Sequence, residues 1–130
     1  MSYLARYVLL RPALSRQTQA GARVDERIVL NLPEYDGGAH VRTFVEDTSR
    51  QRGRRGLPTP RLKLRITDCS NQVHLEFSVD TAEDRENSLH KIDTLIAALD
   101  RFRAGLVAEA ELRAERERTT LIGRRQRCRT

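Results

Sequence analysis

The sequence predicts an α+β fold: a small antiparallel sheet of about four strands, followed by one long C-terminal amphipathic helix packed on one face of the sheet. Three observations predict it. Apolar residues alternate in strand-like fashion up to residue 79, they recur at helical spacing from residue 88 onward, and the length of 130 residues suits one domain. We expect this domain to cover residues 1–118, with an exposed arginine-rich loop at 47–60 and a basic tail at 119–130.

The first half of the chain predicts two strands. Residues 27–32 alternate, with Ile28, Leu30 and Leu32 on one face, and residues 40–46 form the second alternating segment. Between them, residues 33–38 have the composition of a turn, with proline and glycine. Residues 13–25 are polar and small, as in a loop, whereas residues 3–10 fit either a short strand or one helical turn.

Residues 61–79 predict a hairpin. Two alternating segments, 61–68 and 72–79, are separated by the turn sequence Asp-Cys-Ser-Asn. Placing both apolar sets on one face sets Ile66 opposite Val73 and Leu64 opposite Leu75, and it extends to Leu62 opposite Phe77. The same register sets Arg65 opposite His74 and Lys63 opposite Glu76 on the polar face. A slip by one residue would expose a whole apolar row, so the register is well specified.

A long helix follows the hairpin, with its start at either Thr81 or Ser88 and its end near Arg118. Its apolar stripe is Leu89, Ile92, Leu95, Ile96, Leu99, Phe102 and Leu106. We expect the core to centre on Leu75, Phe77, Ile92, Ile96 and Leu99. Residues 88–118 would span about 45 Å as a helix, against about 27 Å for an eight-residue strand. The overhang predicts a homodimer through the C-terminal helix, and the alternative is a monomer that frays near Gly105.

Basic residues are concentrated in two blocks. Arginine outnumbers lysine by 22 to 2, and the formal net charge is +6. Residues 49–65 contain seven basic side chains and no acidic one, whereas residues 66–118 contain seven basic and twelve acidic ones. The last twelve residues add four arginines without an acid. Such single-sign blocks attract polyanions or acidic protein surfaces, although a genome with high GC content also enriches arginine.

The sequence contains no motif for catalysis or for metal binding. His40, His74 and His90, with two cysteines, lack the spacing of a zinc or haem site. No nucleophile–base arrangement or phosphate loop is recognisable, so we expect no enzyme activity, no metal and no cofactor. Cys69 and Cys128 are interpreted as free thiols. The apolar start lacks the features of a signal peptide, and no stretch is long enough for a membrane helix, so we expect a cytoplasmic protein without membrane contact.

The basic blocks therefore provide the functional hypothesis, a small non-enzymatic nucleic-acid-binding domain with weak sequence selectivity. The nucleic acid could be DNA or RNA, and a single strand is one candidate because flexible arginine-glycine segments track single strands. The expected contacts come from the loop, the adjacent polar sheet face and the C-terminal arginines: Arg50, Arg52, Arg54, Arg55, Arg61, Lys63, Arg65, Arg124, Arg125, Arg127 and Arg129. The alternative is an interaction or assembly factor, for example a phage or mobile-element accessory protein, that docks on an acidic protein surface through the loop and the long helix.

Replacing Arg52, Arg54 and Arg55 together with alanine tests the loop. Folding should be unaffected, because single surface changes usually alter stability by less than about 0.5 kcal/mol. The slope of log K against log salt for oligonucleotide binding should become shallower by about 0.7–0.9 for each of these arginines that binds a phosphate. An unchanged slope would remove this loop from the binding surface.

Overall fold

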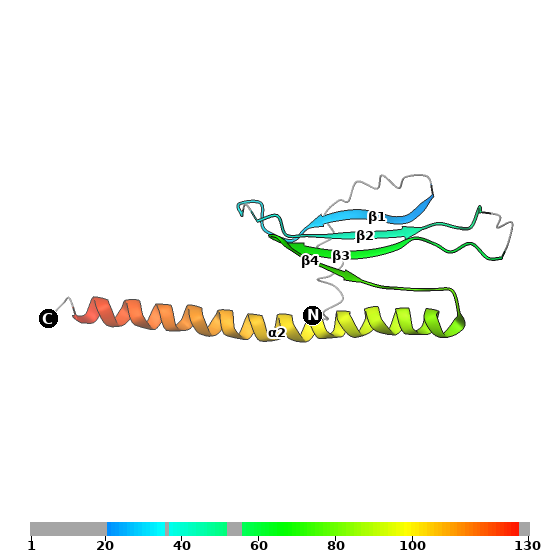
Figure 1. The fold of residues 1–130 in the computed structure, drawn as a ribbon. Helices are drawn as coiled ribbons and strands as arrows, with labels where there is room; N and C mark the ends of the chain where they lie inside the picture. Colours follow the sequence, from blue (N-terminus) through cyan, green and yellow to red (C-terminus); the bar gives the residue numbers. More distant parts are fainter. Residues whose placement is uncertain (1–20, 36, 52–55, 128–130) are drawn as a thin grey trace. The chain divides into compact units, whose positions relative to one another are not determined.

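Four strands form a single antiparallel sheet in the computed structural model, which describes residues 21–35, 37–51 and 56–127 (Figure 1). The strands are β1 (Ala22–Val29), β2 (His40–Glu46), β3 (Leu62–Asp68) and β4 (Asn71–Leu75). Their order in space is their order in sequence, so every strand pairs with its neighbours along the chain. One long helix, α2 (Ala82–Arg127), follows them. The predicted α+β arrangement of four antiparallel strands and a C-terminal helix is confirmed.

The first strand lies earlier in the chain than predicted. β1 begins at Ala22, inside the segment expected to be a loop, and ends at Val29, before the expected limit at Leu32. Its bounds follow from pairing with β2, which runs from Ala22 opposite Glu46 to Val29 opposite His40, with an irregularity near the start. The apolar alternation continues past the paired positions, so Leu32 is exposed in the turn. Residues 3–10 lie outside the described part of the chain.

The predicted β3–β4 register is confirmed. Leu64 pairs with Leu75, Arg65 with His74 and Ile66 with Val73, and the hairpin closes with Asp68 opposite Asn71. The second strand is shorter than predicted, because pairing ends at Leu75. The expected pairs of Leu62 with Phe77 and of Lys63 with Glu76 are therefore absent from the described ladder, and the chain leaves the sheet toward α2 instead.

Strand pairing separates the side chains of the sheet into two faces, because opposite residues point the same way and successive residues alternate. The apolar face contains Val24, Glu26, Ile28, Val41, Thr43, Val45, Leu62, Leu64, Ile66, Val73 and Leu75. The polar face contains Asp25, Arg27, Val29, His40, Arg42, Phe44, Glu46, Lys63, Arg65, Thr67, Gln72 and His74. The sheet thus has one side suited to packing and one side rich in cations.

The helix α2 begins at the first of the two predicted starts. The Thr81 hydroxyl oxygen accepts a hydrogen bond from the Asp84 backbone N–H at 3.0 Å, which makes Thr81 the N-cap. The Asp84 carboxylate does not complete a capping box, because it accepts from the Ser78 hydroxyl at 3.1 Å. Acidic residues occupy the first turn and arginines the last turn, as the helix dipole favours.

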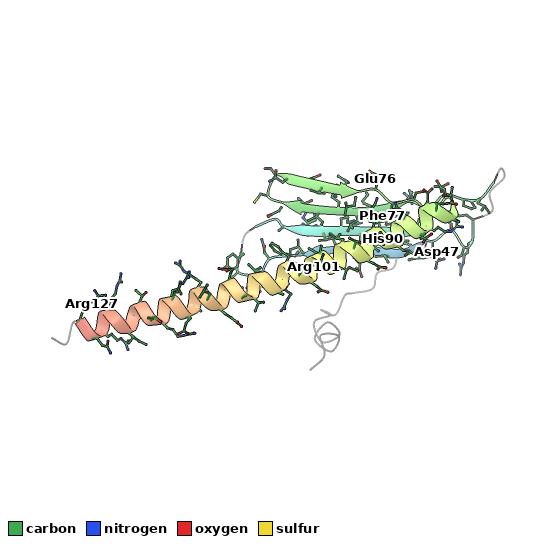
Figure 2. All side chains as sticks on the ribbon, turned by 90° about the horizontal axis from the view of Figure 1, so that it is seen from below. Asp47, Glu76, Phe77, His90, Arg101 and Arg127 are labelled. Carbon is green, nitrogen blue, oxygen red and sulfur yellow. The ribbon has the colours of Figure 1, made fainter. Side chains whose placement is uncertain are left out.

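The predicted end of the helix at Arg118 is wrong. α2 continues through Gly105 without a break and reaches Arg127, so most of the expected basic tail is helical. The Arg113–Glu117 pair, four residues apart with 3.0 Å between Nε and Oε1, supports this extension. With 46 residues, α2 is about 69 Å long. Figure 2 shows side chains projecting on all sides of it, with Arg127 in its final turn.

The predicted core is only partly enclosed. Leu75, Phe77 and Ile92 are half-buried, whereas Ile96 and Leu99 are 50% and 54% exposed. Among the described residues, Ala39 is the only buried apolar one. The sheet and the helix form two compact units that divide at Asp84. The packing of the helix on the apolar face of the sheet stays a prediction.

Replacing Cys69 with glycine should stabilise the hairpin. Cys69 is the first of the two residues in the β3–β4 turn and has φ = +52°, a region that costs a residue with a Cβ about 1–3 kcal/mol. Glycine removes this strain, but its greater conformational freedom in the unfolded chain lowers the stability of the folded state by about 0.4–1 kcal/mol. We expect a net gain of about 0.5–1 kcal/mol in urea unfolding. The matched variant Cys69→Ala keeps the Cβ and should give no gain; equal stability of the two variants would contradict the strain argument.

Candidate nucleic-acid interface

A row of basic residues crosses the polar face of the sheet. Arg27 on β1 pairs with Arg42 on β2, Arg42 pairs with Arg65 on β3, and Arg65 pairs with His74 on β4. We call these four residues the basic row. Adjacent strands lie about 4.8 Å apart, so the row extends over about 14 Å. Like charges directly opposite one another destabilise a sheet, so the neighbouring arginines Arg27, Arg42 and Arg65 favour negatively charged partners.

Next to the basic row lies an aromatic residue surrounded by cations. Phe44 pairs with Lys63 on one side and with Asp25 on the other. The Arg61 guanidinium carbon lies 5.3 Å from the centre of the Phe44 ring, within the range of a cation–π contact. These side chains, with Arg42 and Glu46, line a hollow of about 540 Å³. The hollow therefore combines a planar ring, three cations and two carboxylates.

Glu46 holds together the two ends of the connection between β2 and β3. Its carboxylate accepts hydrogen bonds from the Arg61 backbone N–H at 2.8 Å and from the Arg61 guanidinium at 3.3 Å. The Glu46 backbone N–H in turn donates to the Arg61 carbonyl at 3.0 Å, and Gln51 donates its side-chain amide to the same carboxylate. The Arg61 backbone N–H is the main cause that lowers the pKa of Glu46, followed by the Arg61 side chain.

The cations of the polar face differ in how they are compensated. Arg42 forms an ion pair with Asp25, with 2.6 Å between Nη2 and Oδ1. Lys63, Arg65 and Arg27 form no ion pair with any carboxylate in the described part of the chain. The Nε atom of Arg65 is buried and has no hydrogen-bond partner among the described residues. The face thus keeps uncompensated positive charge, and two of its buried donors, the Arg65 Nε–H and the Thr67 hydroxyl, lack partners among the described residues.

The structure brings together only part of the predicted site. Arg61, Lys63 and Arg65 lie at or on the polar face, and Arg50 is exposed in the connection after β2. Arg52, Arg54, Arg55 and Arg129 lie outside the described residues. Arg124, Arg125 and Arg127 occupy the last turn of α2, in the other compact unit.

Sequence reasoning did not assign Arg27, Arg42 and His74 to the site. The sequence did place Phe44 on the side of its strand opposite Val41 and Val45, and Arg42 shares that side because it is two residues away. The pairing of Arg42 with Arg65 could not be derived, since it depends on register across the long connection at 47–61.

The described part of the chain gives little support for a metal site or for a membrane-spanning helix. No group of three histidine, cysteine or carboxylate side chains there could hold a metal ion. No described helix has both the length and the apolar character needed to cross a membrane. Comparison with protein-family models, with curated proteins and with solved structures finds no match to this chain.

Replacing Glu46 with alanine should destabilise the protein in a pH-dependent way. The pKa of Glu46 is lowered in the folded state, so its contribution to stability is present above the ordinary value of 4.5 and disappears as the pH falls through the lowered value. The thermal midpoint of the variant should lie below that of the wild type at pH 7, and the two should converge in acid. Glu34→Ala, in the exposed β1–β2 turn, is the matched control and should change little. A difference in thermal midpoint between the Glu46 variant and the wild type that does not change with pH would contradict the role of the Glu46 carboxylate.

Proposed function

We propose that this chain is a non-enzymatic nucleic-acid-binding protein that uses the polar face of its sheet, with mainly electrostatic and weakly sequence-selective contacts. The observation that carries the proposal is the basic row, in which Arg27, Arg42, Arg65 and His74 are direct neighbours. A polyanion that bridges Arg27 and Arg65 supplies negative charge beside these arginines and the acceptor that the Arg65 Nε–H lacks. The connection at 47–61 starts after Glu46 and ends at Arg61, which lines the hollow on the same face.

The hollow around Phe44 supports nucleic acid over other polyanions. An aromatic ring is a stacking surface for a base, and a guanidinium plane above it is another. Arg61 occupies this position over Phe44, and its side chain is 76% exposed, so it can move to a phosphate while a base contacts the ring. Lys63, on the strand next to Phe44, adds a point charge for the backbone. Bases that have to stack individually favour a single strand over a duplex.

The alternative function, docking on an acidic protein surface, uses the same charges but gives the Phe44 ring no comparable role. Carboxylates on a protein surface would satisfy Arg65 and Arg27 equally well. Oligonucleotide binding separates the two functions, because an acidic protein partner predicts no binding to single-stranded DNA or RNA even at low salt.

Replacing Lys63 and Arg65 together with alanine should weaken binding to labelled single-stranded oligonucleotides. If each side chain contacts one phosphate, the slope of log K against log salt should become shallower by about 1.4 for the double variant. Fluorescence anisotropy across a salt series measures this slope. Arg101→Ala, an exposed arginine of α2, is the matched control and should leave the slope unchanged. Absence of wild-type binding at low salt would overturn the proposed function.

Phe44→Leu distinguishes stacking from charge in the same assay. Leucine keeps the apolar character of the position but removes the planar ring, so affinity should fall by about 1–3 kcal/mol if one base stacks there. The salt slope should stay the same, since the charge of the protein is unchanged. A slope that changes as much as in the double variant would mean that the variant disturbs the sheet.

A further inference from the structure

The helix α2 is too long for the sheet of its own chain to cover. At about 1.5 Å per residue its 46 residues span about 69 Å. The longest strand, β1, has eight residues and spans about 27 Å. Whichever way the two units are placed, well over half of α2 extends past any strand. A helix ordered over this length needs packing along its apolar side, because isolated helical segments are marginal in water.

An apolar seam runs along the part of α2 that needs such packing. Leu99, Phe102 and Leu106 follow one another at spacings of three and four residues, which places them on one side of the helix. They are 54%, 69% and 58% exposed. Two small residues at four-residue steps, Ala110 and Ala114, continue this side toward the C-terminus. The spacing of three and four is the pattern with which two helices pack side by side.

The charges of α2 favour an antiparallel partner helix of the same sequence. Residues 82–100 contain five acidic and two basic side chains, whereas residues 101–127 contain four acidic and eight basic ones. Two copies side by side in parallel would place the arginine-rich ends together. Two antiparallel copies place the acidic part of each helix beside the basic part of the other, and their dipoles are also opposed.

We propose that α2 pairs antiparallel with α2 of a second copy of this chain and buries the seam of Leu99, Phe102 and Leu106. If the whole of α2 pairs, one side of a helix about 69 Å long and about 10 Å wide offers at most roughly 700 Å², against the roughly 800 Å² per partner of an ordinary stable interface. The twofold arrangement is closed, because each copy uses the same surface. This pairing is independent of the proposed function, since it uses no residue of the polar face.

Sedimentation equilibrium of the full chain at micromolar concentration, without nucleic acid, tests the pairing. The wild type should have a mass near twice 14.9 kDa. Phe102→Glu with Leu106→Glu places charges in the seam and should give a folded monomer. Ala108→Glu, half a turn away from Leu99 on the opposite side of the helix, is the matched control and should remain a dimer. A monomeric wild type, or a double variant that still dimerises, would overturn the proposal.

Spin labels determine the orientation of the two helices. Cysteines introduced singly at Thr94, Ala104 and Thr119, with the native cysteines replaced by serine, give three distances between the two copies. An antiparallel pair gives one short distance near the crossing point and distances that grow by about 3 Å per residue away from it. Three similar distances would indicate a parallel pair and overturn the antiparallel assignment, whatever the outcome of the nucleic-acid assay.

Discussion

Pairing between β2 and β3 is the constraint on which the rest of the sheet depends. These two strands are joined by the long connection at 47–61, and their ladder sets Val41 opposite Ile66 and Arg42 opposite Arg65. A shift of one residue would move every cation of β3 to the other side of the sheet. Glu46 fixes the connection at the point where the ladder ends, because it binds both the backbone and the side chain of Arg61. The separation into an apolar and a polar face therefore rests on contacts at the two ends of one loop.

The sequence was most informative where partners are close along the chain. The β3–β4 register was predictable, because a short turn and two alternating segments leave one arrangement that keeps Ile66 and Val73 on the same face. The start of α2 was narrowed to two positions, and the Thr81 cap decides between them. The bounds of β1 were wrong for a physical reason: its first half contains Arg23 and Asp25, which belong to the strand beside β2 although their polarity resembles a loop. The helix end was wrong because the apolar stripe thins long before the backbone hydrogen bonding stops.

The candidate site was predictable only in part, for the same reason. Alternation along β3 placed Lys63 and Arg65 on a polar face, and the hairpin register added His74 beside Arg65. Arg42 and Phe44 belong to the site because β2 pairs with β3, although the long connection separates the two strands in sequence. No local sequence pattern encodes that register. Arg27 belongs to the site because β1 pairs with β2, and β1 lies earlier in the chain than the segment expected to be a strand. Composition identified the kind of surface, whereas long-range pairing decides which side chains form it.

The order of the elements along the chain has a consequence for biosynthesis. Every strand contacts only its neighbours in sequence, so the strand pairing of the sheet involves no residue beyond Leu75. A ribosome that has made the sheet still has to make all of α2, which ends 52 residues later, at Arg127. The strands can therefore pair co-translationally, before the seam of α2 has been made. Nascent chains on neighbouring ribosomes of one polysome would meet through that late segment, after each has completed its own sheet.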